Sequence, residues 1–183
     1  MKYVVAQDLA WKELSALAQE EKYTLGFLSD QYDIDLKNRL VLSRSCNVPA
    51  KDYLSIVLLH YLIQKIKGLP RITNEWLSFK QLPGGQGYYP TFKKRVIGVI
   101  VKKYAPHPEA LLALGDRFQA KRTQLADFSV VLEVFEQLPA LINFWRGDDE
   151  FGPEANLLFD QSISSILCTE DVVVLAEVLA HTI

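Results

Sequence analysis

Three glycines precede a basic run in the middle of the chain. Residues 83–89 read PGGQGYY, and Lys93, Lys94 and Arg95 follow shortly after. Backbone N–H groups exposed at a helix N-terminus, with cations nearby, bind anions such as phosphate or carboxylate. The sequence therefore predicts an anion-binding site here. Its expected members are Gly84, Gly85, Gly87, Tyr88, Tyr89 and Lys93.

The same glycines also have a structural interpretation. Their spacing matches neither the P-loop nor the dinucleotide-binding fingerprint. Glycine also occurs wherever a tight turn requires a positive φ. Anion binding and a purely structural turn therefore both remain open from the sequence.

Consecutive acidic residues form a second candidate site. Trp145 is followed closely by Asp148, Asp149 and Glu150. Clustered carboxylates bind hard divalent cations, and they raise one another's pKa, which is one way to make a general acid. These four residues are therefore candidates for ligand binding. The run lacks the alternation of an EF-hand loop, so the alternative is a solvated corner that caps the following segment.

Few other residues suggest chemistry. His60 lies inside an apolar run and is interpreted as a core or boundary histidine. His107 lies between two prolines, and His181 lies near the end of the sequence. Cys46 and Cys168 are expected to be small buried residues, and neither has an adjacent histidine or a CxxC partner. Two cysteines cannot supply the four thiolates of an iron–sulfur cluster or a zinc site. We therefore predict no metal and no cofactor.

Charge is distributed unevenly along the chain. The total of 20 basic and 22 acidic residues gives a net charge of −2. Residues 61–122 contain 12 basic and 3 acidic residues, whereas residues 123–183 contain 1 basic and 11 acidic residues. The acidic third would repel phosphate, which argues against nucleic acid as a partner. The two blocks are expected to face each other within the fold or across a symmetric dimer.

Hydrophobic spacing predicts the elements of the N-terminal half. Residues 3–20 show helical spacing, and residues 23–28, 32–36 and 39–43 favour three short antiparallel strands with a turn at 37–38. A helix is expected from a first turn containing Pro49 to a stop at Gly68. Residues 68–90 are expected to form a structured loop, because their aromatic residues need cover.

The second half continues the mixture of helices and strands. Helices are expected from Pro90 to residue 104, over 107–114 with a stop at Gly115, and over 171–181 with Thr169 as N-cap. Strands are expected at 128–135, 141–145 and 156–159, and Asp160 is expected to cap the turn 161–163. The expected fold class is α+β, an antiparallel sheet of short strands with helices packed on it, in a single globular domain over residues 1–183.

The chain shows no membrane signal. No stretch approaches the ~20 apolar residues that span a bilayer, and the first residues lack a signal-peptide pattern. We therefore expect a cytoplasmic protein with no membrane partner.

Three stretches together resemble a known family. They are LLHYLIQKIKGLP, EWLSFKQLPGGQGYYPTF and LPALINFWRGDDEFGPEANLLFDQSISSILCTED. Their order resembles the domain-of-unknown-function family 3786, found mostly in anaerobic bacteria and archaea, over about residues 25–182. The resemblance implies no catalytic residues. Longer relatives carry a cysteine-rich iron–sulfur segment, whereas this chain has no cysteine cluster, so the resemblance implies no redox role for it.

These observations lead to one main functional expectation and two alternatives. We expect an accessory or ligand-binding domain that binds an anionic small molecule or a protein partner at the glycine-rich segment. The alternatives are an enzyme that uses a divalent cation at Asp148 to Glu150, and a structural homodimer or interaction module. We further expect the glycine-rich segment and the acidic corner to lie close together, with the ligand between them.

Overall fold

Two antiparallel sheets organise the chain, with strand orders β1-β2-β3 and β4-β8-β7-β6-β5. The structure is a computed structural model that describes residues 2–183, with side chains from residue 3 onward. The strands are β1 (Lys22–Phe27), β2 (Asp30–Asp35), β3 (Leu40–Ser43), β4 (Trp76–Ser78), β5 (Lys121–Thr123), β6 (Phe128–Phe135), β7 (Leu138–Trp145) and β8 (Glu154–Asp160). The expected α+β class is confirmed.

Helices cover both sheets. The α-helices are α1 (Lys2–Leu17), α2 (Asp52–Lys67), α3 (Gly85–Phe92), α4 (Gly98–Tyr104), α5 (Leu114–Phe118) and α6 (Thr169–Thr182). Shorter helical segments are η1 (Phe79–Gln81), the π-helical η2 (Lys93–Ile97), η3 (Pro108–Ala113) and η4 (Gln161–Ser165). None of the helices within residues 2–183 combines the length and the apolar character that crossing a bilayer requires.

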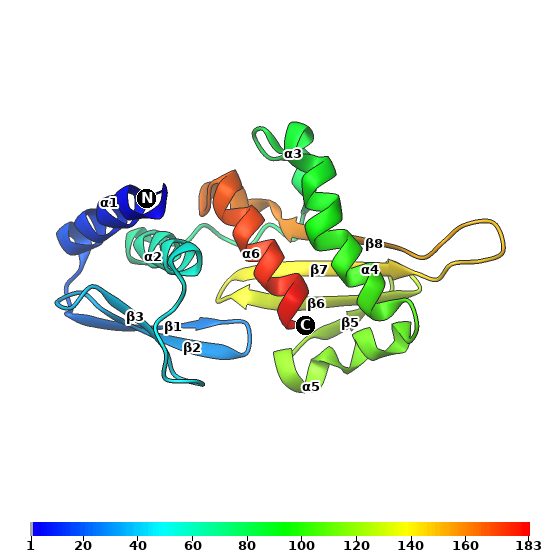
Figure 1. Cartoon of the computed structure of the whole chain (residues 1–183), viewed down its shortest axis with the longest axis horizontal. Helices are drawn as coiled ribbons and strands as arrows, with labels where there is room; N and C mark the ends of the chain where they lie inside the picture. The colour runs from blue at the N-terminus through cyan, green and yellow to red at the C-terminus, as the bar shows by residue number, and fades with distance from the viewer. Residues whose placement is uncertain (1) are drawn as a thin grey trace.

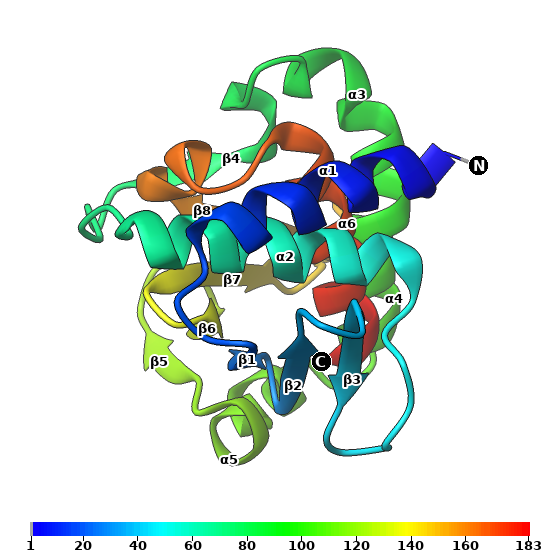
Figure 2. The same cartoon turned by 90° about the vertical axis from the view of Figure 1, so that its left-hand side faces the viewer.

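The N-terminal part consists of α1, the three-stranded sheet and α2 (Figure 1). Helix α1 packs along α2, as Figure 2 shows. Every second strand residue, such as Leu25 and Ile34, is buried beneath these helices. The expected helix stop is confirmed, because Gly68 has a φ of 105°. The expected start is wrong: Pro49 forms a β-bridge with Leu42, and the helix begins at Asp52.

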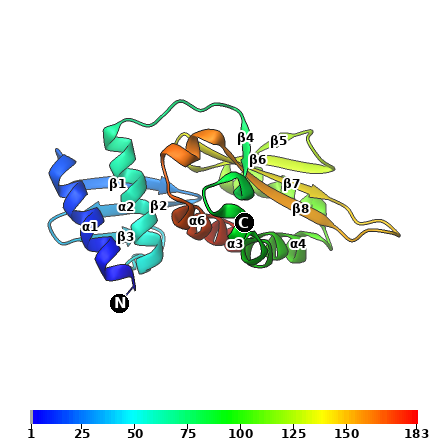
Figure 3. The ribbon, with the colours of Figure 1, turned by 90° about the horizontal axis from the view of Figure 1, so that it is seen from above.

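The C-terminal part is the five-stranded sheet with its helices. Figure 3 shows that α3, α4 and α6 lie on one face of this sheet. The expected strands are all present, and β6 and β7 form a tight hairpin. The edge strands β4 and β5 were not expected from the sequence. Each has only three residues, too few to show an alternating pattern.

One nearly continuous helix runs through α3, η2 and α4. It begins at Gly85, whereas the sequence predicted a start at Pro90; Pro90 instead lies inside α3. Because Pro90 has no backbone N–H, one i→i−4 hydrogen bond of the helix cannot form. The π-helical segment η2 follows within one turn. The predicted apolar stripe is confirmed, since it buries Phe92, Val96, Ile100 and Tyr104 and half-buries Val99.

The segment after α4 differs from its expected form. Residues 108–113 form a 3₁₀ segment, and α5 continues to Phe118. Gly115 therefore lies inside a helix and does not end it. Gln119 ends it, in a left-handed conformation with a φ of 53°.

A single hydrophobic core joins the two parts. Tyr61 on α2 stacks on Phe135 at the end of β6, with ring centroids 4.0 Å apart. Its hydroxyl donates a hydrogen bond to the backbone oxygen of Glu136 at 2.6 Å. Phe27 of β1 also contacts Phe135, with centroids 4.9 Å apart. These contacts fix the three-stranded sheet and α2 against the larger sheet.

Candidate functional site

The glycine-rich segment forms the start of helix α3. Gly84 has a φ of 72°, and a Cβ on Gly85 would lie 2.0 Å from the backbone oxygen of Phe79. These two glycines are therefore required by a left-handed turn and by close backbone packing. A Cβ on Gly87 would meet no atom within 4 Å, so this position has no such constraint. The geometry thus gives two of the three glycines a structural role.

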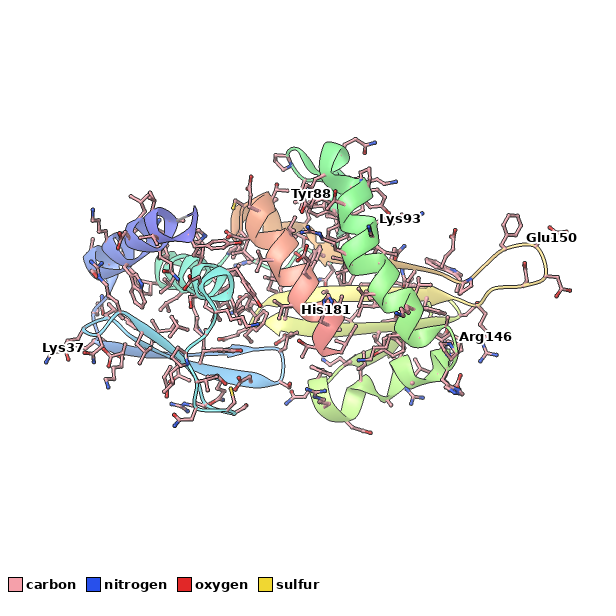
Figure 4. All side chains as sticks on the ribbon, viewed as in Figure 1. Lys37, Tyr88, Lys93, Arg146, Glu150 and His181 are labelled. Atoms are coloured by element: carbon pink, nitrogen blue, oxygen red, sulfur yellow. The ribbon has the colours of Figure 1, made fainter. Side chains whose placement is uncertain are left out.

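The aromatic residues of this segment pack locally. The Lys80 ammonium lies 4.1 Å from the centroid of the Tyr89 ring, and Tyr88 is partly exposed beside Phe79. Lys93 follows on the next turns of the helix, away from its N-terminus (Figure 4). The expected cation is therefore not at the glycine-rich turn.

The acidic corner forms the tip of the β7–β8 hairpin. Asp148 Oδ1 accepts hydrogen bonds from the backbone N–H groups of Glu150 and Phe151, at 2.9 and 2.7 Å. These two bonds hold the pKa of Asp148 below its usual range. Asp149 and Glu150 are exposed. Among residues 2–183, no group of three or more histidine, cysteine, aspartate or glutamate side chains is placed to hold a metal ion.

The two predicted segments do not meet. Figure 4 places Tyr88 and Lys93 on the helices, whereas Glu150 lies at the far tip of the hairpin. The physical reason is that α3 packs on η1, while β7 and β8 extend beyond the body of the sheet. The opposite charges of the two blocks instead pair at two other places: Arg95 and Glu177 lie 3.2 Å apart where α6 lies beside η2, and Lys65 on α2 pairs with Glu136 at the β6–β7 turn.

A different set of residues gathers around a pocket between α1, α2 and α6. The pocket has a volume of about 210 Å³. Polar groups from three elements line it, together with two isoleucines. The lining residues are Glu13, His60, Ile63, Gln64, Ile166, Cys168 and Asp171.

A histidine–aspartate pair forms the centre of this pocket. His60 Nδ1 lies 2.8 Å from Asp171 Oδ2. The Asp171 side chain is only 7% exposed, whereas that of His60 is 34% exposed. The hydrogen bond to Asp171 raises the pKa of His60, although burial opposes the shift, and the negative charges of Asp171 and Glu13 add to it.

The local sequence explains why these side chains meet. His60 lies on α2 at the border between its buried face and the surface. Asp171 lies in the first turn of α6, where the positive end of the helix dipole favours a carboxylate. Packing of α2 against α6 brings the two residues together. The Glu13 carboxylate, from α1, is itself paired with Lys67 at 2.6 Å.

A protein-family model matches residues 8–182 and is described as Domain of unknown function (DUF3786). The chain belongs to this family. The resemblance seen in the sequence is thereby confirmed, and the match extends into α1, before the expected start near residue 25. Searches of the curated proteins and of the solved structures found no match.

In this DUF3786 chain the pocket also contains a cysteine. Cys168 Sγ lies 3.2 Å from Asp171 Oδ2, the same oxygen that binds His60. Although residue 168 is exposed as a whole, partial burial of its sulfur and the nearby Asp171 charge raise the pKa of Cys168 to about 12. The group is therefore a neutral thiol at neutral pH, and not a thiolate nucleophile. The expectation that both cysteines are buried is wrong, because Cys46 and Cys168 are both exposed.

The start of α6 also differs from its prediction. Cys168, and not Thr169, occupies the N-cap position. The Thr169 hydroxyl instead donates to the backbone oxygen of Pro83 at 2.8 Å, which ties α6 to the segment before α3. The predicted cap at Asp160 is confirmed, since its Oδ1 accepts the Ser162 N–H at 3.0 Å.

In the DUF3786 pocket, one nitrogen of the His60 ring is available for hydrogen bonding or proton exchange. Because Asp171 occupies His60 Nδ1, the other ring nitrogen, Nε2, remains for a ligand or a proton, and no residue in the described part of the chain bonds it. A carboxylate behind the imidazole fixes the orientation of the ring and stabilises its charged form. His60 can therefore donate a hydrogen bond from Nε2 or exchange a proton there.

Sequence reasoning missed this group because its members lie far apart in the chain. His60 is an ionisable side chain in a long apolar helical stretch, and Asp171 has the pattern of an ordinary helix-terminal carboxylate. The spacing of three between Cys168 and Asp171, at the start of a helix, was the available signal.

Proposed function

We propose that this chain is a ligand-binding domain whose ligand is a small anionic molecule bound at His60. The observation that carries the proposal is the Asp171-held imidazole in the pocket between α1, α2 and α6. An imidazolium with one free N–H favours an acceptor oxygen, and a carboxylate is the strongest common acceptor of this kind. The glycine-rich segment is not part of this site.

The size and the charges of the pocket narrow the ligand class. A volume of about 210 Å³ is below the usual range of pockets for drug-sized ligands, so a compound of a few carbons fits better than a nucleotide. The positive charges of protonated His60 and of Lys67 offset the negative charges of Asp171 and Glu13, which leaves the pocket close to neutral. The Gln64 amide offers a further donor.

The two free thiols are evidence about the cellular compartment in which the protein acts. Two free cysteines, both exposed, suit a reducing environment, and we propose that the domain acts in the cytoplasm.

NMR of the histidine side chains tests the binding proposal. The probes are formate, acetate, malonate and succinate at millimolar concentration. The chain has His60, His107 and His181, so single glutamine variants assign the three imidazole signals. We expect at least one probe to shift the His60 signal in a saturable way.

The matched variants are His60→Gln and His107→Gln, since His107 is exposed and lies outside the pocket. Binding should be lost in the first and kept in the second. If none of the four probes moves the His60 signal, or if His60→Gln binds them as well as the natural chain does, the proposal is wrong.

A further inference from the structure

One carboxylate in the pocket between α1, α2 and α6 serves two hydrogen-bond partners. Asp171 Oδ2 lies 2.8 Å from His60 Nδ1 and 3.2 Å from Cys168 Sγ. An ionised carboxylate accepts hydrogen bonds and has no hydrogen to donate. The hydrogen of each contact therefore belongs to the imidazole and to the thiol.

The contact with Asp171 selects one tautomer of neutral His60. A neutral imidazole carries a single ring hydrogen, and Asp171 holds it on Nδ1, so that Nε2 has a lone pair and acts as an acceptor. When His60 takes up a proton, Nε2 gains a hydrogen and becomes a donor. The nitrogen that is left for a ligand thus changes from acceptor to donor, while Nδ1 stays bonded to Asp171.

The charges that face His60 act in the same direction. Helix α6 contributes the carboxylate of Asp171, α1 contributes that of Glu13, and α2 itself contributes Lys67, whose ammonium lies 2.6 Å from the Glu13 carboxylate. Cys168, which leads into α6, adds no charge because it is a neutral thiol. With neutral His60, two negative charges stand against one positive charge, which leaves a net charge of −1 around a pocket of about 210 Å³. Protonation of His60 brings this net charge to zero.

We infer that an anion enters this pocket only together with a proton that His60 takes up, so that the domain binds its ligand as the pH falls and releases it as the pH rises. This behaviour rests on the proposed function, because it is the condition under which that site is filled. Without the proton, a carboxylate ligand meets a lone pair on Nε2 and a net negative charge. With the proton, it meets a charged N–H donor in a neutral pocket.

The release falls above pH 6.5. The hydrogen bond to Asp171 raises the pKa of His60 above its ordinary value of 6.5, although burial opposes the shift. The form that binds is therefore complete well below the folded pKa and is lost as the pH rises through it. Since one proton accompanies each anion, the affinity should fall about tenfold for each pH unit above the folded pKa. The linkage is reciprocal, so a bound anion raises the pKa of His60.

The experiment uses the full chain and the probes formate, acetate, malonate and succinate, each of which has at least one ionised carboxylate from pH 6 upward. NMR of the His60 signal gives the dissociation constant of each probe from pH 6 to pH 9.5, and also the pH midpoint of His60 itself. For every probe that binds, we expect a constant affinity below this midpoint and a loss of about tenfold per pH unit above it. A saturating probe should raise the His60 midpoint and leave those of His107 and His181 unchanged.

A substitution behind the imidazole tests the origin of the effect. Asp171→Asn removes the charge that stabilises the imidazolium, so the His60 midpoint should fall and the loss of affinity should move to lower pH by the same amount. Asp149→Asn is the matched control, because it removes a carboxylate at an exposed position of the β7–β8 hairpin tip. It should leave both the midpoint and the affinity unchanged.

Two kinds of failure can be told apart. An affinity that stays constant across the His60 midpoint, or a saturating probe that leaves this midpoint in place, would overturn the coupling to a proton and leave the ligand site intact. If no probe shifts the His60 signal even at pH 6, the ligand site is wrong and the coupling falls with it. If Asp171→Asn does not fold, the midpoint of the natural chain with and without probe still decides the question.

Discussion

His60 Nδ1 and Asp171 Oδ2 lie 2.8 Å apart, although 111 positions separate the two residues in the sequence. The contact joins α2 in the N-terminal part to α6 in the C-terminal part. It therefore does two things at once: it connects the two parts of the fold, and it orients the imidazole in the pocket.

The pH dependence of stability should report this contact. The pKa of His60 is raised above its unfolded value of 6.5. Its contribution to stability is therefore fully present below pH 6.5 and is lost as the pH rises through the folded pKa. Melting temperatures measured from pH 5 to pH 9 should fall over that range, and the fall should be smaller in His60→Gln. Equal slopes in the two proteins would contradict the assignment.

Alanine substitutions at the two glycines Gly85 and Gly87, at the start of α3, should change the stability of the protein in opposite directions. Gly85→Ala places a Cβ 2.0 Å from the Phe79 backbone oxygen, so the backbone must shift, and we expect a loss of about 2–3 kcal/mol. Gly87→Ala meets no atom within 4 Å and should stabilise the helix by about 0.5 kcal/mol. Urea unfolding of both variants measures the difference. A similar effect of the two substitutions would show that the close approach at Gly85 is absent.

The buried carboxylate of Asp160 should be essential for folding. It accepts hydrogen bonds from Ser162 and from the backbone N–H groups of Thr73 and Asn74, and it is 0% exposed. Burial favours the neutral acid, but these bonds outweigh it and lower its pKa. Asp160→Ala should cost about 3 kcal/mol, because it leaves buried donors unpaired.

Acid titration provides an independent check on Asp160. A lowered pKa means that its contribution is present above its unfolded value of 3.8 and is lost as the pH falls through the folded pKa. Urea midpoints should therefore depend less on pH in Asp160→Asn than in the natural chain at acidic pH. Asp149→Asn, at an exposed position of the hairpin tip, should behave as the natural chain does.

Tyr61 should be the main contact between the two parts. It is 1% exposed and stacks on Phe135, and its hydroxyl bonds the backbone oxygen of Glu136. Tyr61→Ala should cost about 3–5 kcal/mol through the cavity it leaves. Tyr61→Phe keeps the stacking and should cost only about 1 kcal/mol, the net value of one hydrogen bond. Equal losses would show that the stacking contributes little.

Much of the fold could be predicted from local sequence signals. The stripe from Phe92 to Tyr104, the stop at Gly68 and the turn between β2 and β3 depend on neighbouring residues alone. The start of α3 could not be predicted in this way. Glycine is a poor helix former, so no local signal favours a helix that begins at Gly85. Glycine is required there because a Cβ would lie 2.0 Å from the Phe79 backbone oxygen, a packing contact that the local sequence does not reveal.

The site was less predictable than the fold, because it depends on tertiary packing. Composition drew attention to the glycines and to Asp148, Asp149 and Glu150, but local hydrogen bonds and backbone packing explain Gly84, Gly85 and Asp148. The residues that do gather come from α1, from α2, and from α6 with the segment that leads into it. Pairing between distant residues such as His60 and Asp171 leaves no periodic signal in one sequence.

The pairing of β4 with β8 has a consequence for synthesis on the ribosome. Residues 76–78 complete the larger sheet only by pairing with residues 158–160. Until that late segment has been made, the apolar surfaces of α2 and of the long helix through α4 that contact α6 stay exposed, because α6 follows later still. The larger sheet and the helices that pack on it can therefore reach their final arrangement only when most of the polypeptide has been made.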